Sequence, residues 1–168
     1  DSPAITLAQA QGVEVRGDID LFVAEAKRPV IGITGSNGKS SVTTFVGQLL
    51  TACGKRVAVG GNLGVPALEL LNETPDVYVL ELSSFQLERA GDLNLAVATV
   101  LNLSPDHLDR HQTMPLYHLA KHRIFAGAKN VVANYRDALT QPVGKGDVPW
   151  VLWRDSEPDL NQLGLREH

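Results

Sequence analysis

The sequence predicts an α/β fold in which a mostly parallel sheet carries helices on both faces. Short apolar runs rich in β-branched residues recur along the chain, and segments with helical periodicity separate them. Strands that alternate with helices form parallel sheets, because each helix returns the chain to the same end of the sheet. The run at 96–101 is almost continuously apolar, which is typical of a strand covered on both faces.

The expected elements follow one another from residue 30 onwards. Strands are predicted from residue 30 to a glycine-rich turn, and at 56–59, 77–82, 96–101, 130–133 and 148–153, with helices at 39–52, from Pro66, and at 115–126. The first helix should bury one apolar face, formed by Val42, Phe45, Val46, Leu49 and Leu50. Gly54 is expected just past its end, where glycine is favoured.

The first 28 residues are predicted to be the end of a preceding domain and a linker. A helical pattern covers 5–10, a short strand is expected at 13–15, and a second helix at 19–26 has Asp18 as its N-cap. Pro29 then interrupts the pattern before the first strand. We therefore expect two units, the end of a preceding domain with its linker at 1–28 and a separate α/β domain at 29–168.

Composition excludes several classes of protein. The chain has 168 residues, 43% apolar and 20% charged, with a net charge of −4, so no basic excess indicates a nucleic-acid surface. The apolar runs are too short to span a membrane, and the first residues lack a signal-peptide pattern. A monomer in the cytoplasm is expected. The single cysteine, Cys53, is expected to be buried and unreactive.

A glycine-rich turn between the first strand and its helix predicts a phosphate-binding loop of the P-loop NTPase kind. Its residues are Gly35, Ser36, Asn37, Gly38, Lys39, Ser40 and Ser41. Backbone N–H groups and the start of the helix would surround the phosphates, with Lys39 on the β- and γ-phosphates and Ser40 on Mg²⁺. The general pattern has another glycine where this chain has Ile33, so a plain strand-to-helix turn with a surface lysine is the alternative.

Polar residues also follow the other predicted strands, at the edge where ligands bind in such sheets. Glu81 ends an apolar strand and is a candidate Mg²⁺ ligand, although a helix cap or a solvated charge is the alternative. His107 follows the next strand and is either a metal ligand or a packed histidine. Lys121 lies in a basic helical stretch that, by composition alone, is simply a solvated face.

These motifs together resemble the Mur ligases. The phosphate loop without its early glycine is similar to the ATP loop of that family, and further similarities follow in the same order at 60–64, 80–87, 106–110, 117–121 and Asn134. The segment 80–87 has the form found in the branch that joins D-glutamate to UDP-N-acetylmuramoyl-L-alanine. The resemblance covers nearly the whole chain and implies the family's central-domain fold.

The resemblance implies an ATP-dependent amide ligase of peptidoglycan precursor synthesis, with an acyl-phosphate intermediate and two Mg²⁺ ions. Catalysis would involve Lys39, Glu81, His107 and Lys121. Ser40 and Glu81 would hold one ion, and Glu81, His107 and a carbamate formed on Lys121 would hold or support the second. The side chains facing the muramoyl substrate would be Asn62, Ser83, Gln86 and His107.

Other functions remain open at this point. Another P-loop ATPase or kinase domain would share the phosphate loop, and a non-catalytic nucleotide-binding module would need little more. A regulatory GTPase would need an Asn-Lys-x-Asp motif, but its nearest counterpart, at 134–137, has Tyr135 in place of the lysine. The family uses three domains, so the chain alone is expected to bind nucleotide without completing the ligase reaction.

Overall fold

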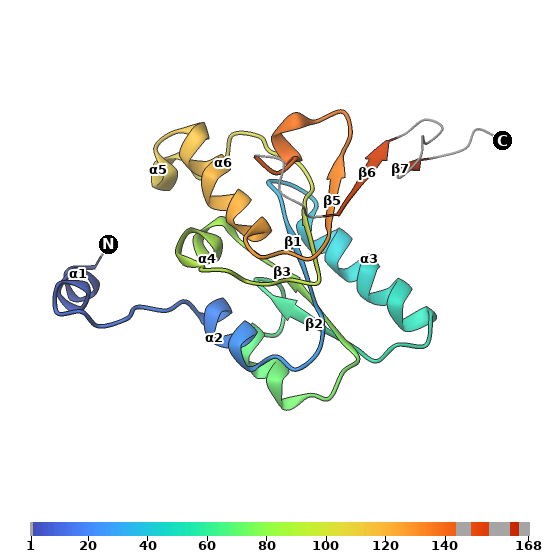
Figure 1. Ribbon diagram of the computed structural model, residues 1–168, viewed down its shortest axis with the longest axis horizontal. Coiled ribbons are helices and arrows are strands. Elements are labelled where there is room, and N and C mark those ends of the chain that lie inside the picture. The colour runs from blue at the N-terminus through green and yellow to red at the C-terminus, as the bar shows by residue number, and fades with distance from the viewer. Residues whose placement is uncertain (1, 144–148, 155–161, 165–168) are drawn as a thin grey trace.

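The computed structural model of the protein describes residues 2–143, 149–154 and 162–164, and its centre is a parallel sheet (Figure 1). Seven strands of the described residues pair in the order β2-β3-β1-β4-β5-β6-β7. Their bounds are β1 Val30–Thr34, β2 Val57–Gly61, β3 Val77–Glu81, β4 Val97–Val100, β5 Val131–Asn134, β6 Trp150–Arg154 and β7 Gln162–Gly164. All six pairings are parallel, as the alternation of strands and helices predicts.

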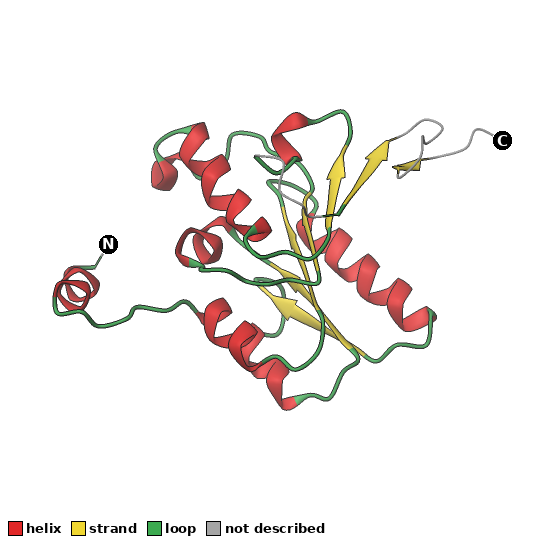
Figure 2. Ribbon diagram, viewed as in Figure 1, coloured by secondary structure: helices red, strands yellow, loops and turns green. Residues whose placement is uncertain are grey.

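Helices cover both faces of the sheet (Figure 2). The α-helices are α1 Pro3–Ala10, α2 Asp18–Glu25, α3 Lys39–Ala52, α4 Ser84–Arg89, α5 Leu108–His111 and α6 Met114–His122. The described part of the chain also has three short 3₁₀ helices. They are η1 Ala67–Asn72 after β2, η2 Arg123–Phe125 after α6, and η3 Ala138–Thr140 after β5. In Figure 1, α3 lies on one side of the sheet, and α2, α4 and α6 lie on the other. None of the helices in the described part of the chain is long and apolar enough to cross a bilayer.

The main apolar core lies between the sheet and the helices α2, α4 and η2. Phe22 of α2 is fully buried and packs edge-on against Tyr78 of β3, with ring centroids 5.1 Å apart. Leu95 and Ile124 approach β1 at Gly32 so closely that a Cβ there would lie 2.5 Å from Leu95 Cδ1. The second helix of the predicted linker thus contributes directly to the core of the sheet.

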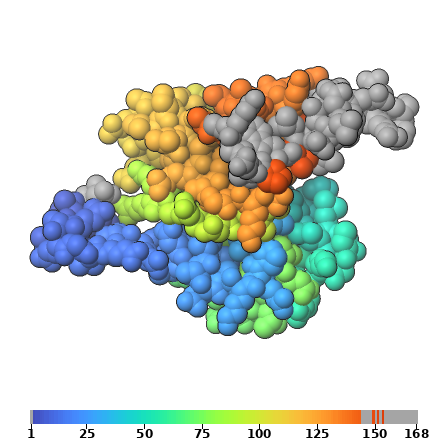
Figure 3. Space-filling model, in the orientation of Figure 1, coloured from blue at the N-terminus to red at the C-terminus, as the bar shows by residue number. Residues whose placement is uncertain are grey.

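The structure corrects the expectations for the opening segment. The strand expected at 13–15 is wrong, because those residues pair with no strand of the sheet, and Val13 and Val15 are exposed. Asp18 does not cap α2; the N-cap is Gly17, whose N–H donates to Asp20 Oδ2 at 3.1 Å. In Figure 3, α1 projects from the body of the molecule, and none of its residues is buried.

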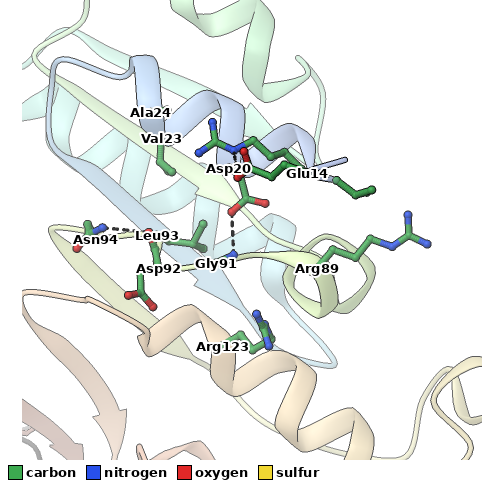
Figure 4. A pocket seen from close by; sticks show the side chains of 12 residues that line it. Glu14, Asp20, Val23, Ala24, Arg89, Gly91, Asp92, Leu93, Asn94 and Arg123 are labelled. Carbon is green, nitrogen blue, oxygen red and sulfur yellow. Dashed lines mark hydrogen bonds and ion pairs between the residues drawn. The ribbon is translucent and has the colours of Figure 1, made fainter. Parts of the chain in front are cut away.

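A pocket of about 380 Å³ lies where this segment meets the domain (Figure 4). Asp20 Oδ1 accepts a hydrogen bond from Gly91 N at 2.8 Å, and Arg123 Nε donates to the carbonyl oxygen of Ala90 at 2.8 Å. These two hydrogen bonds engage polar groups that line the pocket or lie beside it. They fasten α2 and η2 to the turn that follows α4.

The helix α3 has the predicted bounds, but the predicted buried face is wrong in part. Phe45 and Leu49 are 58% and 49% exposed, whereas Thr43 and Gly47 are buried. A Cβ at Gly47 would lie 2.6 Å from Val59 Cγ2, so the absent side chain lets the helix lie close against β2. A hydrophobicity pattern cannot detect this, because the contact is made by the smallest residue.

Several other expectations change in detail. The helix expected from Pro66 is the 3₁₀ helix η1, and the helix expected at 115–126 divides into α6 and η2. Helices α4 and α5 were not predicted, since each spans fewer than two turns. Residue 148 of the last expected strand lies outside the described residues. Cys53 is exposed, not buried, because it is the C-cap of α3 at the surface.

Candidate functional site

The phosphate loop occupies residues 35–41, between the end of β1 and the first turn of α3. Gly38 is the N-cap of α3 and has φ +77°, a conformation that favours glycine. A Cβ at Gly35 would lie 3.1 Å from Leu101 Cβ, so this position also suits a residue without a side chain. The two glycines therefore have the separate roles of turning the chain and allowing close packing.

Asn102, which follows β4, holds the loop from the side. Its Oδ1 accepts from Asn37 N at 2.9 Å, its Nδ2 donates to Asn37 O at 3.0 Å, and its carbonyl oxygen accepts from Ser36 N at 3.0 Å. Lys39 Nζ donates to Ser36 O at 3.0 Å. The loop thus has a defined shape, with the Lys39 ammonium folded across it. Nothing local in the sequence indicates that Asn102 clamps the loop, because its partners lie 65 positions away.

Glu81 provides a buried carboxylate beside the loop. It ends β3 and is 2% exposed. Ser40 Oγ donates to Glu81 Oε2 at 2.7 Å, and Asn62 Nδ2 donates to Oε1 at 2.8 Å. Asn62 N also donates to the carbonyl oxygen of Glu81 at 2.9 Å. The structure therefore brings together three residues predicted from different strand ends.

Gly61 makes this arrangement sterically feasible. It is the last residue of β2 and has φ +99°. A Cβ there would lie 2.4 Å from the carbonyl oxygen of Glu81, and any side chain would push β2 away from β3. The glycine pair before Asn62 thus lets that residue reach the Glu81 carboxylate.

Lys121 is a buried cation, not a solvated one. It lies on α6 and is 1% exposed. Its Nζ donates to Thr34 Oγ1 at 3.2 Å and lies 5.0 Å from the centroid of the Tyr117 ring. Burial, and secondly the charge of Lys39, lower the pKa of Lys121 from 10.5 to about 8, against the attraction of Asp106 and Glu81. The neutral form of the Lys121 amine is therefore accessible from about pH 8 upwards.

His107 is held in the left-handed region, with φ 50°, at the N-cap of α5. Its Nε2 lies 3.5 Å from Asp106 Oδ2, its side chain is half exposed, and its ring centroid lies 5.0 Å from that of Phe85. These contacts leave His107 at the surface near Asp106 and Phe85, not within the hydrogen-bonded cluster of Ser40, Asn62 and Glu81.

The buried histidine in this region is His111, which the sequence analysis did not single out. Its Nε2 lies 2.9 Å from Ser84 Oγ, and burial lowers its pKa. Its ring lies between those of Phe85 and Tyr117, with centroids at 5.7 and 5.2 Å. The Tyr117 hydroxyl in turn lies 3.0 Å from Ser36 Oγ in the phosphate loop. A packed series of rings therefore connects α4 and α5 with the loop.

Ser83 and Gln86 form the N-terminal cap of α4. Ser83 Oγ accepts from Gln86 N at 3.2 Å, and Ser83 N donates to Gln86 Oε1 at 3.1 Å. Gln86 Nε2 donates to Asp18 Oδ2 at 3.0 Å, which connects α4 with α2. Both side chains therefore stabilise the start of α4, independently of any ligand.

The cluster around Glu81 suits a hard dication. Mg²⁺ binds carboxylate and hydroxyl oxygens together with phosphate oxygens and water, and Ser40 and Glu81 offer such oxygens beside a phosphate loop. In the part of the chain that the structure describes, no three His, Cys, Asp or Glu side chains are grouped to hold a metal by themselves. A dication beside Glu81 would therefore need phosphate oxygens and water for the rest of its coordination.

The segment that carries this site matches a known family. The model of the family described as "Mur ligase middle domain" matches residues 33–148, which include the phosphate loop, Glu81, His107 and Lys121. The chain belongs to the Mur ligase family. A curated relative from Pseudomonas syringae pv. syringae (strain B728a), the UDP-N-acetylmuramoylalanine–D-glutamate ligase, is 58% identical over 167 residues, covering 99% of this chain and 37% of that protein.

Solved structures confirm the α/β fold of this Mur ligase family member. A pseudomurein peptide ligase type C from Methanothermus fervidus superposes with a TM-score of 0.62 at 24% identity, covering 90% of this chain and 33% of that one. The MurF ligase from Thermotoga maritima, solved in complex with ADP, superposes with a TM-score of 0.54 at 23% identity, covering 88% and 34%. The chain spans 37% of the length of the curated relatives that it matches.

Proposed function

We propose that this chain is the central, ATP-binding part of a UDP-N-acetylmuramoylalanine–D-glutamate ligase. Relatives with that name are 57% and 58% identical over 99% of the chain. The observation that carries the proposal is the buried Glu81 carboxylate, 2.7 Å from the Ser40 hydroxyl at the start of α3. In this assignment residues 1–28 are the end of the preceding domain and a linker, and residues 29–168 are the ATP-binding domain.

In the proposed reaction, ATP transfers its γ-phosphoryl group to the carboxylate of UDP-N-acetylmuramoyl-L-alanine, giving an acyl phosphate and ADP. The D-glutamate amine then attacks the acyl carbon, phosphate leaves, and an amide bond forms. The backbone N–H groups of the loop and Lys39 bind and orient the phosphates. Mg²⁺ held by Ser40 and Glu81 supplies neutralising charge at the transferred group.

A second ion and a carbamate on Lys121 are part of the proposal. Glu81, His107 and the modified Lys121 would support that ion. A carbamate forms when a neutral amine bonds to the carbon of CO₂ and releases a proton, so the side chain becomes an anion. The buried Lys121 amine, with its pKa lowered to about 8, supports this step because the neutral form is accessible.

We expect a carbamate to be visible by carbon NMR. Incubation with ¹³C-bicarbonate at pH 8 should give one protein-bound carbamate signal, which disappears in a Lys121→Met variant and on acidification. The variant Lys129→Met, which removes an exposed lysine from the same part of the chain, should keep the signal. A signal that persists in Lys121→Met, or no signal in the wild-type protein, would contradict the modification.

The muramoyl substrate is proposed to contact Asn62, Ser83, Gln86 and His107. Asn62 and Gln86 each use an amide N–H within the protein, on Glu81 and on Asp18 respectively. Substrate would therefore bind to their remaining polar groups or exchange with these partners. We also infer a monomer in the cytoplasm that acts on small molecules, with neither nucleic acid nor membrane as a partner.

The nucleotide site is tested by calorimetric titration of Mg·ATP, with Mg·GTP alongside, into the chain and its Lys39→Ala variant. Adenine-selective binding that falls at least tenfold in Lys39→Ala is expected, since the ammonium lies across the phosphate loop. Lys55→Ala, at an exposed lysine beyond α3, serves as the control and should bind normally. Preference for GTP, or equal binding by wild type and Lys39→Ala, would contradict the site.

Catalysis by the ligase requires the whole protein. Restoring the flanking domains should give D-glutamate-dependent release of phosphate, which Lys39→Ala abolishes. ATP binding together with D-glutamate-independent turnover would instead favour a different P-loop ATPase or kinase. Binding without any turnover in the complete protein would favour a non-catalytic nucleotide-binding module.

A further inference from the structure

Two histidines outside the proposed nucleotide site converge on one oxygen atom. His118 and His122 lie one turn apart on α6, and their ring centroids are 3.8 Å apart. His118 Nε2 lies 3.0 Å and His122 Nε2 lies 2.7 Å from the same acceptor, the carbonyl oxygen of Leu139 in η3. Two imidazole nitrogens thus meet at one carbonyl oxygen.

The two N···O separations are close to those between neighbouring ligand atoms of a metal ion. Two histidines at positions i and i+4 of a helix present their rings to one ion, as in helical zinc motifs. In a tetrahedral site with bonds of about 2.0–2.2 Å, ligand atoms lie about 3.3 Å apart. The observed N···O separations are a few tenths of an ångström shorter, so a small outward shift of the rings would admit an ion among them.

His122 has a second unusual feature. Its Nδ1 is buried and has no hydrogen-bond partner among the residues that the structure describes. Nε2, not Nδ1, contacts the Leu139 carbonyl oxygen, so the unpartnered atom is not one of the ligand atoms. Burial also lowers the pKa of His122, and the charge of His118 lowers it further, against the raising effect of the Leu139 hydrogen bond. A neutral imidazole is the form that binds metals.

We propose that His118, His122 and the carbonyl oxygen of Leu139 bind a transition-metal dication, for which Zn²⁺ is the probe. Imidazole nitrogen selects ions such as Zn²⁺ over Mg²⁺, so this site is chemically distinct from the cluster at Glu81. Among the described residues no third His, Cys, Asp or Glu joins the pair, and water completes the coordination. A bound ion would fasten α6, which carries Tyr117 and Lys121, to η3.

Binding at Nε2 has a cost that sets the expected affinity. The ion replaces the Nε2 proton, and the neutral ring then carries its proton on Nδ1, which in His122 has no acceptor. Loss of such a supporting hydrogen bond weakens metal sites by roughly 10–100-fold. Titrations should therefore extend into the high micromolar range.

The test measures thermal unfolding of the chain with increasing Zn²⁺, together with the visible spectrum of the Co²⁺-loaded protein. We expect Zn²⁺, but not Mg²⁺, to raise the Tm by several degrees, and Co²⁺ to show the intense bands of a tetrahedral site. In the double variant His118→Gln/His122→Gln both effects should be lost, and the affinity for Zn²⁺ should fall at least tenfold. Glutamine keeps a polar side chain, and circular dichroism of each variant checks its fold.

His168→Gln is the matched control, because it removes a histidine that is not part of the pair and has no proposed role in metal or substrate binding. It should bind Zn²⁺ like the wild-type protein. Equal Zn²⁺ affinity in wild type and the double variant would overturn the site, as would a Tm increase that is lost in His168→Gln. Nucleotide binding is a separate measurement, so failure of one proposal leaves the other intact.

Discussion

Replacing Glu81 with glutamine is expected to remove the Mg²⁺ dependence of ATP binding and to lower kcat of the complete ligase by roughly 10²–10³-fold. Glutamine has nearly the same shape, and its carbonyl oxygen still accepts one of the two hydrogen bonds from Ser40 and Asn62. What disappears is the negative charge that would hold the ion. The loss should therefore affect metal-dependent binding and catalysis far more than folding.

The measurement compares ATP affinity in Mg²⁺ and in EDTA for wild type and Glu81→Gln. Glu88→Gln is the control, because Glu88 is exposed and forms a surface ion pair with Arg110 at 3.0 Å. That pair contributes little, so Glu88→Gln should behave like the wild-type protein. If Glu81→Gln keeps the full Mg²⁺ effect, the ion is held elsewhere and the proposed metal role of Glu81 is wrong.

The parts of the site that the sequence predicts are those that follow from local pattern. A glycine-rich turn between an apolar run and a helix has few other geometries, so the strand–turn–helix arrangement and the bounds of α3 are confirmed, whereas phosphate binding by the loop stays a prediction. Polar residues after parallel strands must reach the same edge of the sheet, and this places Glu81 beside Ser40 although 41 positions separate them.

The parts that the sequence does not predict depend on contacts between distant segments. No local pattern identifies Asn102 as the residue that clamps the loop. No local pattern shows that His111, and not His107, is the buried histidine. The burial of Lys121 cannot be predicted from composition either, because a Lys-His-Arg stretch on a helix usually faces water. The side chains of Phe45 and Leu49 are exposed because α3 turns the side with Gly47 towards β2 instead. Only the packed structure reveals this contact.

Replacing Lys121 with methionine is expected to stabilise the fold while it abolishes the proposed ligase activity. The buried ammonium has one side-chain hydrogen bond, to Thr34 Oγ1, and lies near the like charge of Lys39. The decrease of its pKa from 10.5 to about 8 corresponds to about 3 kcal/mol of unfavourable free energy for the charged form in the folded state. Methionine has a similar length and no charge, so most of that cost should disappear at pH 7.

The difference in stability between the wild-type protein and Lys121→Met should depend on pH, because the pKa of Lys121 is lowered in the folded state. Below pH 8 the lysine is protonated in both the folded and unfolded states, so the full cost of burying its charge opposes folding. Between about pH 8 and 10.5 the unfolded state binds more protons, and the stability of the wild-type protein should rise with pH relative to Lys121→Met. The advantage of the variant should therefore be largest near pH 7 and vanish near pH 10.5.

Urea unfolding of both proteins at several pH values measures this difference directly, and subtracting the two curves removes groups that titrate equally in both. Samples freed of CO₂ keep the lysine unmodified, whereas added bicarbonate should stabilise only the wild-type protein if the carbamate forms. A difference that stays constant from pH 7 to 10.5 would show that Lys121 titrates normally, and the buried-cation account of this site would then be wrong. A variant that is more stable yet inactive would indicate that the burial of Lys121 is maintained for function at the expense of stability.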